Sequence, residues 1–184
     1  VVSGNTFYNF PGGLGGNGTA VVIQQEGGSG GDNIWIIFND ISNCYEGVRT
    51  EEVLTNVYVI GNIIRDVYSQ SGNSALSTRT SGTQTSFVDN TIYNLGTGVH
   101  GVSWDGQGGN APDLQLSGNI FAGKTDNTAS WYDGDATLVS RTSNRNAFDS
   151  SGQFRVTWEG TTYTSLAAFQ SGKGEETNSI QGDT

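Results

Sequence analysis

The fold is decided by the stretch YVIGNIIRD, residues 58–66. It contains a short run of β-forming residues, then Gly61 and Asn62, and then a second short run. Asparagine tolerates the left-handed backbone conformation that a sharp bend requires. The stretch therefore predicts two short strands joined at a bend. It also places Ile64 on the inward face of the second strand, because successive strand side chains point to opposite faces.

The same pattern recurs along the chain in five clear copies and one degenerate copy at residues 146–148. Successive leading asparagines lie 23 to 34 residues apart, within the roughly 20–50 residue period of solenoid repeats. The uneven spacing is typical of strands of constant length joined by turns of variable length. Stacked copies would place one asparagine above the next, so that side-chain amides hydrogen-bond along the axis. The expected column contains Asn5, Asn39, Asn62, Asn90 and Asn119.

A further strand follows the bend in successive coils. Glycine-rich segments connect the coils and are interpreted as turns, because neither a helical pattern nor a Lys-Ser/Thr pair follows them. The apolar period of a helical repeat is absent. The sequence thus predicts an all-β fold, a right-handed parallel β-helix of about six coils, with its coils over residues 1–145. The additional strands are expected over residues 18–24, 47–50, 74–79 and 98–104.

The pattern changes over residues 146–184, which we assign to the same domain. Residues 153–163 read as a hairpin that turns at Glu159-Gly160. Thr164 is the expected N-cap of a short helix over residues 165–171, with Gly172 ending it. Leu166 and Phe169 fall on one face of that helix and are expected to cover the side of the solenoid.

Composition excludes several classes of function. The chain has 184 residues and a formal net charge of −10, which disfavours binding to nucleic acid phosphates. No apolar run is long enough for a membrane span. The single cysteine, Cys44, allows no internal disulfide and is expected to be a buried apolar residue. The polar, acidic composition and the lack of methionine indicate a secreted or cell-surface protein, either mature or truncated.

The segment from Trp158 to Ile180 resembles the late coils of bacterial right-handed parallel β-helix repeat proteins. The residues that carry the resemblance are Trp158, Gly160, Tyr163, Ser165, Leu166, Phe169, Gln170, Gly174, Glu176, Ser179 and Ile180. The group includes polysaccharide lyases and epimerases, and phage tailspikes share its architecture. The resemblance implies the β-helix fold and a polysaccharide as partner. Compared with that group, both ends of the chain are expected to be cut and uncapped.

Carbohydrate sites on β-helices lie on one strand face, where side chains of successive coils form a groove. Arg49, Arg79 and His100 are the candidate catalytic residues, since a lyase must neutralise a uronate carboxylate and remove a proton. The candidates for binding substrate are Glu26, Trp104 and Asp105. Glu51 and Glu52, together with Asp105, could hold Ca²⁺ through oxygen ligands.

Each candidate also has a structural interpretation. Glu51 and Glu52 could be a solvated loop pair, with Arg49 and Arg79 as their surface partners. His100 could be structural, and Trp104 could pack under a loop instead of serving as an exposed sugar platform.

Two functions therefore remain open. One is a secreted carbohydrate-directed domain that binds an acidic polysaccharide or cleaves it, with a lyase-type activity if it is an enzyme. The other is a structural surface or filament subunit. Uncapped ends expose unpaired strands, which could stack head-to-tail without catalysis.

Overall fold

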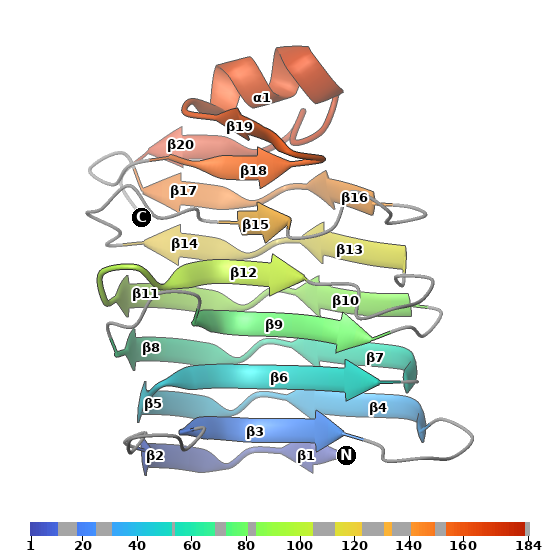
Figure 1. Cartoon of the computed structure of the whole chain (residues 1–184), viewed down its shortest axis with the longest axis vertical. Coiled ribbons are helices and arrows are strands. Elements are labelled where there is room, and N and C mark those ends of the chain that lie inside the picture. The colour runs from blue at the N-terminus through green and yellow to red at the C-terminus, as the bar shows by residue number, and fades with distance from the viewer. Residues whose placement is uncertain are drawn as a thin grey trace.

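The computed structural model describes residues 1–10, 18–24, 31–52, 54–68, 73–80, 84–104, 113–122, 131–133, 141–149 and 154–182. The described fold is all-β with one short helix, and its strands stack along a common axis to form three sheets that each run along that axis (Figure 1). Sheet A contains β1 (Val2–Ser3), β4 (Gly31–Ile37), β7 (Leu54–Ile60), β10 (Gln84–Val88), β13 (Asp113–Ser117) and β16 (Arg141–Asn144).

In each coil, the strand of sheet A is followed along the chain by a strand of sheet B and then by a strand of sheet C. Sheet B contains β2 (Thr6–Phe10), β5 (Asp40–Cys44), β8 (Ile63–Val67), β11 (Thr91–Leu95), β14 (Ile120–Ala122), β17 (Ala147–Asp149) and β20 (Ile180–Gly182). Sheet C contains β3 (Thr19–Gln24), β6 (Glu46–Glu52), β9 (Ser74–Thr80), β12 (His100–Trp104), β15 (Trp131–Asp133), β18 (Val156–Trp158) and β19 (Thr161–Tyr163).

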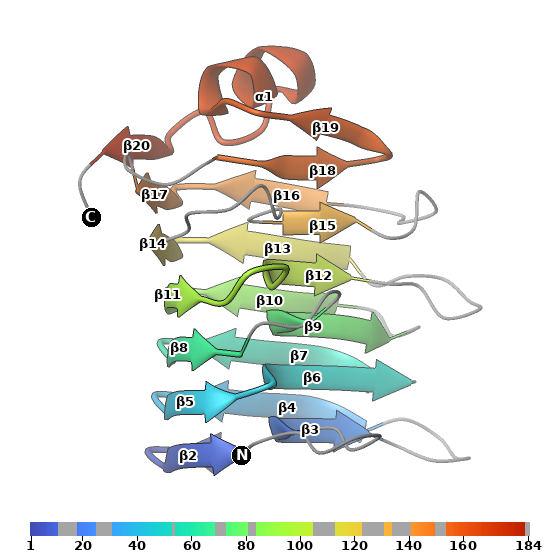
Figure 2. The ribbon, with the colours of Figure 1, turned by 60° about the vertical axis from the view of Figure 1, so that its left-hand side comes forward.

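The chain visits the sheets in turn, so that strands three elements apart become parallel neighbours. The result is a β-helix-like stack of coils, which Figure 2 shows from a second side. The expected downstream strands correspond to β3, β6, β9 and β12. In the part of the chain that the structure describes, no helix is both long and apolar enough to cross a lipid bilayer.

An asparagine ladder runs along the corner between sheets A and B. In each step, one asparagine donates its backbone N–H and its Nδ2 to the Oδ1 atom of the next, at 2.8–3.2 Å. All five expected asparagines are members, and Asn146 from the degenerate copy is a sixth. Asn39, Asn62, Asn90 and Asn119 are buried, so the ladder satisfies polar groups that would otherwise be costly inside the protein.

The bend geometry differs from the prediction. The residue with positive φ is the one before each ladder asparagine, which leaves the asparagine free to use its side chain for the ladder. Along the stack, the positions directly before the ladder asparagines alternate between glycine and larger residues. A Cβ on Gly61 would lie 2.6 Å from the ring of Phe38, so the larger side chain occupies the space that the glycine leaves. The residues at these positions are Gly4, Phe38, Gly61, Asp89, Gly118 and Arg145.

The core lies between the three sheets. The residue two positions after each buried ladder asparagine points inward, as predicted, and is buried. Burying each of these side chains contributes about 1.5–3 kcal/mol. Cys44 is also fully buried, which confirms the expectation for it. The inward residues of this column are Ile41, Ile64, Ile92, Phe121 and Phe148.

The C-terminal end of the stack is covered by the hairpin β18–β19 and by α1 (Leu166–Lys173) (Figure 1). Leu166 and Phe169 are buried as expected, and the Phe169 ring lies 5.3 Å from the ring of Trp158. These aromatic contacts cover the core at the end of sheet C, whereas β16 and β20 are the last described strands of sheets A and B, so the expectation of an uncapped C-terminal end stays a prediction. Helix prediction was wrong by one residue at the start, since Ser165 and not Thr164 is the N-cap. The C-cap is Gly174 and not Gly172, because Gly174 takes the left-handed conformation.

Glu176 closes the asparagine ladder at the same end. Asn146 donates its Nδ2 to Glu176 Oε1 at 2.8 Å and its backbone N–H to Ser179 Oγ at 2.8 Å. The hydroxyls of Ser143 and Ser179 donate to the same carboxylate. Burial raises the pKa of Glu176, and the hydrogen bonds from Ser143, Ser179 and Asn146 partly oppose that shift.

Candidate functional site

The outer face of sheet C carries most of the candidate residues that the structure describes. Within β6, Val48 and Thr50 are fully buried and face the core, so Arg49 and Glu51 face outward. Parallel pairing places matching positions of β3, β6, β9 and β12 in register along the stack. Thr19 pairs with Glu46, and Ser74 pairs with His100. The longer register columns are Val22, Arg49, Ser77 and Ser103, and Gln24, Glu51 and Arg79.

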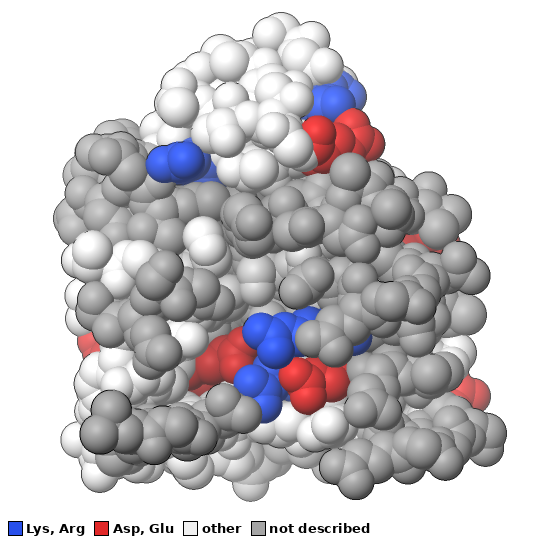
Figure 3. Space-filling view, in the orientation of Figure 1, with Lys and Arg blue, Asp and Glu red and all other residues white. Residues whose placement is uncertain are grey.

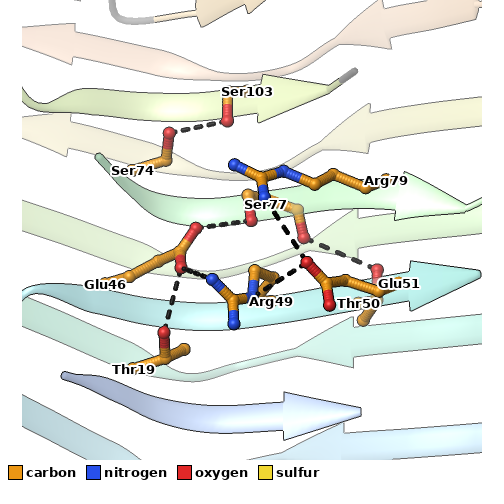
Figure 4. Close-up of polar contacts among 9 residues, drawn as sticks. All are labelled: Thr19, Glu46, Arg49, Thr50, Glu51, Ser74, Ser77, Arg79 and Ser103. Carbon is orange, nitrogen blue, oxygen red and sulfur yellow. Dashed lines mark hydrogen bonds and ion pairs between the residues drawn. The ribbon is translucent and has the colours of Figure 1, made fainter. Parts of the chain in front are cut away.

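Glu46 is the centre of the polar contacts on this face (Figure 4). Its carboxylate accepts hydrogen bonds from Thr19 Oγ1 at 3.0 Å, from Arg49 Nη1 at 3.1 Å and from Ser77 Oγ at 2.7 Å. These donors come from β3, β6 and β9, so one buried carboxylate joins three neighbouring strands.

Burial, followed by the charge of Glu46 and that of Asp66, raises the pKa of Cys44 to about 12, which keeps its thiol protonated.

Arg49 and Arg79 both approach Glu51. Arg49 Nε lies 3.2 Å from Glu51 Oε1, and Arg79 Nη1 lies 3.4 Å from the same oxygen. The Arg49 side chain is mostly buried, whereas the Arg79 side chain is 34% exposed. The structure therefore brings together two of the predicted catalytic residues and one predicted metal ligand.

The four charged groups of this network balance one another. Glu46 and Glu51 carry two negative charges, and Arg49 and Arg79 carry two positive charges. Figure 3 shows these red and blue groups gathered on the face over β6 and β9. We call this set, Glu46, Arg49, Glu51 and Arg79, the charged network.

The charged network does not fit a Ca²⁺ site. The Oε1 atom of Glu51 is already in contact with two guanidinium groups, and Ca²⁺ usually needs six to eight oxygen ligands. Within the described residues, no group of three or more histidine, cysteine, aspartate or glutamate side chains could hold a metal ion. The side chain of Glu52 lies outside the described part, so its predicted metal role stays a prediction.

The other predicted site residues have different outcomes. Trp104 is only 1% exposed, and its ring packs edge-to-face on Trp158 with centroids 5.7 Å apart. The expectation of an exposed sugar platform at Trp104 is therefore wrong, because the side chain points into the core. His100 begins β12 in register with Ser74, whose hydroxyl donates to Ser103 Oγ at 2.6 Å. The predicted residues Glu26 and Asp105 lie outside the described residues.

Sequence reasoning missed Glu46 and Ser77. The asparagine spacing aligns sheets A and B, but loops of variable length separate those strands from sheet C. Partners across sheet C therefore cannot be aligned from the asparagine positions. A possible signal was the placement of Glu46 three residues before Arg49, which reaches it within the same strand.

Comparisons of the chain with protein-family models, with curated proteins and with solved structures find no match. The assignment of a function therefore rests on the geometry of the side chains.

Proposed function

We propose that the chain is a right-handed parallel β-helix of the polysaccharide-directed kind, a secreted or cell-surface domain that binds an acidic polysaccharide across the outer face of sheet C. One observation carries the proposal: two arginines from adjacent strands converge on one carboxylate oxygen on that face. Guanidinium groups recognise carboxylates through charge-assisted hydrogen bonds. The serine and threonine hydroxyls around them can bond to sugar hydroxyls.

The contacts favour binding over cleavage. A lyase needs a base with a free lone pair near the sugar, and a hydrolase needs two carboxyl groups facing each other across the glycosidic bond. In the charged network, Glu46 accepts from three donors and Glu51 lies against two arginines. Both carboxylates thus already serve as partners of other side chains, which suits a binding surface better than a catalytic base.

The structural alternative, end-to-end assembly, has less support. Head-to-tail stacking needs an open strand edge at each end of the stack. At the C-terminal end, α1 and the β18–β19 hairpin cover the core, and Glu176 ends the ladder. Stacking of a second copy there would require the displacement of these elements.

The test is binding of oligogalacturonate and oligoguluronate, measured by calorimetry, with and without a calcium chelator. A neutral dextran serves as the ligand control. Arg79→Ala should weaken binding about tenfold or more, because a charge-assisted hydrogen bond contributes about 1.5–3 kcal/mol. Absorbance of an unsaturated product would be followed in parallel to detect lyase activity.

Arg65→Ala is the matched control variant. Arg65 lies on sheet B, pairs with Asp40 and Asp66, and has a side chain that is 30% exposed, close to that of Arg79. It should leave the affinity unchanged. The proposal fails if no uronate binds, or if Arg65→Ala weakens binding as much as Arg79→Ala does.

A further inference from the structure

The contacts of Glu51 with the two arginines are loose. Charge-assisted hydrogen bonds between a guanidinium and a carboxylate are usually about 2.7–2.9 Å long, whereas the two contacts to Glu51 Oε1 are 3.2 and 3.4 Å. The Nε atom of Arg49 is buried, yet no described group accepts an aligned hydrogen bond from it. A donor of this kind is costly unless a partner completes it.

Arg49 is nevertheless held firmly. Its Nη1 donates to Glu46, which is itself bonded to Thr19 and Ser77 on the two neighbouring strands. The guanidinium plane is therefore fixed by one carboxylate, while the side that carries Nε meets, among the described residues, the imperfectly placed Glu51. A guanidinium has five N–H donors, so the pair Arg49 and Arg79 can accommodate a better placed carboxylate than Glu51 provides.

We propose that Glu51 is an internal placeholder, whose carboxylate occupies in the free protein the position that a uronate carboxylate of the ligand takes in the complex. The inference rests on the proposed function and concerns the same site. The incoming carboxylate approaches past the partly exposed Arg79, Glu51 turns out toward solvent, and the ligand accepts hydrogen bonds from Arg49 Nε and from Arg79.

The exchange preserves the charge balance between the arginines and their carboxylate partners. One carboxylate leaves them and another enters, so neither arginine is left as an uncompensated, partly buried charge at any stage. The placeholder also explains why Glu51 is present on a surface that should attract acidic sugars. Without it, the mostly buried Arg49 would keep only Glu46 as an ionic partner in the free protein.

The proposal predicts the sign of a substitution. Glu51→Gln removes the competing charge but keeps the size of the side chain, so trigalacturonate should bind about three- to tenfold more tightly than to the wild type. A Ca²⁺-ligand role for Glu51 predicts the opposite, a loss of calcium-dependent binding. A purely structural role predicts unchanged or weaker binding, and either of these results would overturn the placeholder.

Two further variants complete the experiment. Glu51→Asp keeps the negative charge but shortens the side chain by one methylene group, so it should tighten binding less than Glu51→Gln does. It also serves as the test variant if Glu51→Gln does not fold. Asp40→Asn, beside Arg65 on sheet B, is the matched control and should leave the affinity unchanged. As a direct readout, the Arg49 Nε–H resonance should shift when trigalacturonate is added, and a resonance that does not move contradicts the exchange.

The two proposals fail in different ways. If the wild type binds trigalacturonate and Arg79→Ala does not, the proposed function stands, and only the Glu51 variants decide the placeholder. If neither the wild type nor Glu51→Gln binds any uronate, the proposed function fails and the placeholder fails with it. If Glu51→Gln binds a uronate and the wild type does not, both proposals fail for the wild type, because its Glu51 is then not displaced by the ligand.

Discussion

Replacement of Asn90 by alanine tests the asparagine ladder at its most buried part. The Asn90 side chain makes four hydrogen bonds: it accepts from the N–H and the Nδ2 of Asn62, and it donates to Val59 O and to Asn119 Oδ1. In Asn90→Ala the buried backbone N–H of Asn62 loses its acceptor, which costs about 1–3 kcal/mol. The other three bonds contribute about 0.5–1.5 kcal/mol each.

The expected loss is therefore about 2.5–7.5 kcal/mol of unfolding free energy, which lowers the Tm of a chain of this size by about 5–30 °C. Urea unfolding followed by far-ultraviolet circular dichroism, with a thermal melt beside it, measures both quantities. The control is Asn5→Ala at the exposed N-terminal end of the ladder. Asn5 is exposed, and among the described residues its Nδ2 donates to Ser3 O and to Asn39 Oδ1. In Asn5→Ala, Asn39 Oδ1 still accepts the backbone N–H of residue 5.

Asn5→Ala should therefore cost less than about 1 kcal/mol. Equal losses in the two variants, or a loss below about 1 kcal/mol for Asn90→Ala, would refute the view that burial makes the ladder stabilising. A middle result at Asn39→Ala, next to the exposed end, would support the graded dependence on burial.

Three further predictions concern single positions. Because burial raises the pKa of Glu176, the contribution of this residue to stability should be fully present below its ordinary pKa of 4.5 and be lost as pH rises through the raised value, so Glu176→Gln should remove that part of the pH dependence of unfolding. A Cβ on Gly47 would meet the carbonyl oxygen of Ala75 and lie 2.7 Å from Ile64 Cγ2, so Gly47→Ala should cost about 1–3 kcal/mol in urea titrations, while Gly182→Ala, with open space around it, should cost almost nothing. Ser165→Ala should cost about 1 kcal/mol through loss of the hydrogen bond from Ala168 N, and an equal effect of Thr164→Ala on the melting curve would contradict the cap assignment.

The stacked fold was predictable because its signal is local and repeated. Each copy places a ladder asparagine and an inward apolar residue two positions later, and both patterns are confirmed by the structure. The backbone detail of the bend was not predictable from the asparagine alone. Gly61 and Phe38 show why: the left-handed position precedes the asparagine, and non-glycine residues are accommodated there by a glycine in the next coil.

The site was predictable only in part. Arg49, Glu51 and Arg79 were placed on one face from strand alternation, and parallel pairing does bring them together. Trp104 was predicted on the wrong face because the sequence of its strand does not show which face is buried. In the structure Trp104 pairs with Thr78, and both side chains are buried. Glu46 was missed because its partners Thr19 and Ser77 lie one coil away on either side, across loops whose lengths the sequence does not align.

The ladder and the charged network have complementary roles in this fold. The ladder joins successive coils at the corner between sheets A and B, through hydrogen bonds of backbone and side-chain amides that already have partners within the ladder. On sheet C the coils are joined by strand pairing, and Glu46 adds one further link across three strands. Replacing a buried ion pair with apolar residues of similar size is often neutral for stability, whereas removal of one partner is costly. The pairing of Glu46 with Arg49 is therefore not required to hold the sheet together, and in the proposed function its role would be to orient the guanidinium group of Arg49 toward a ligand.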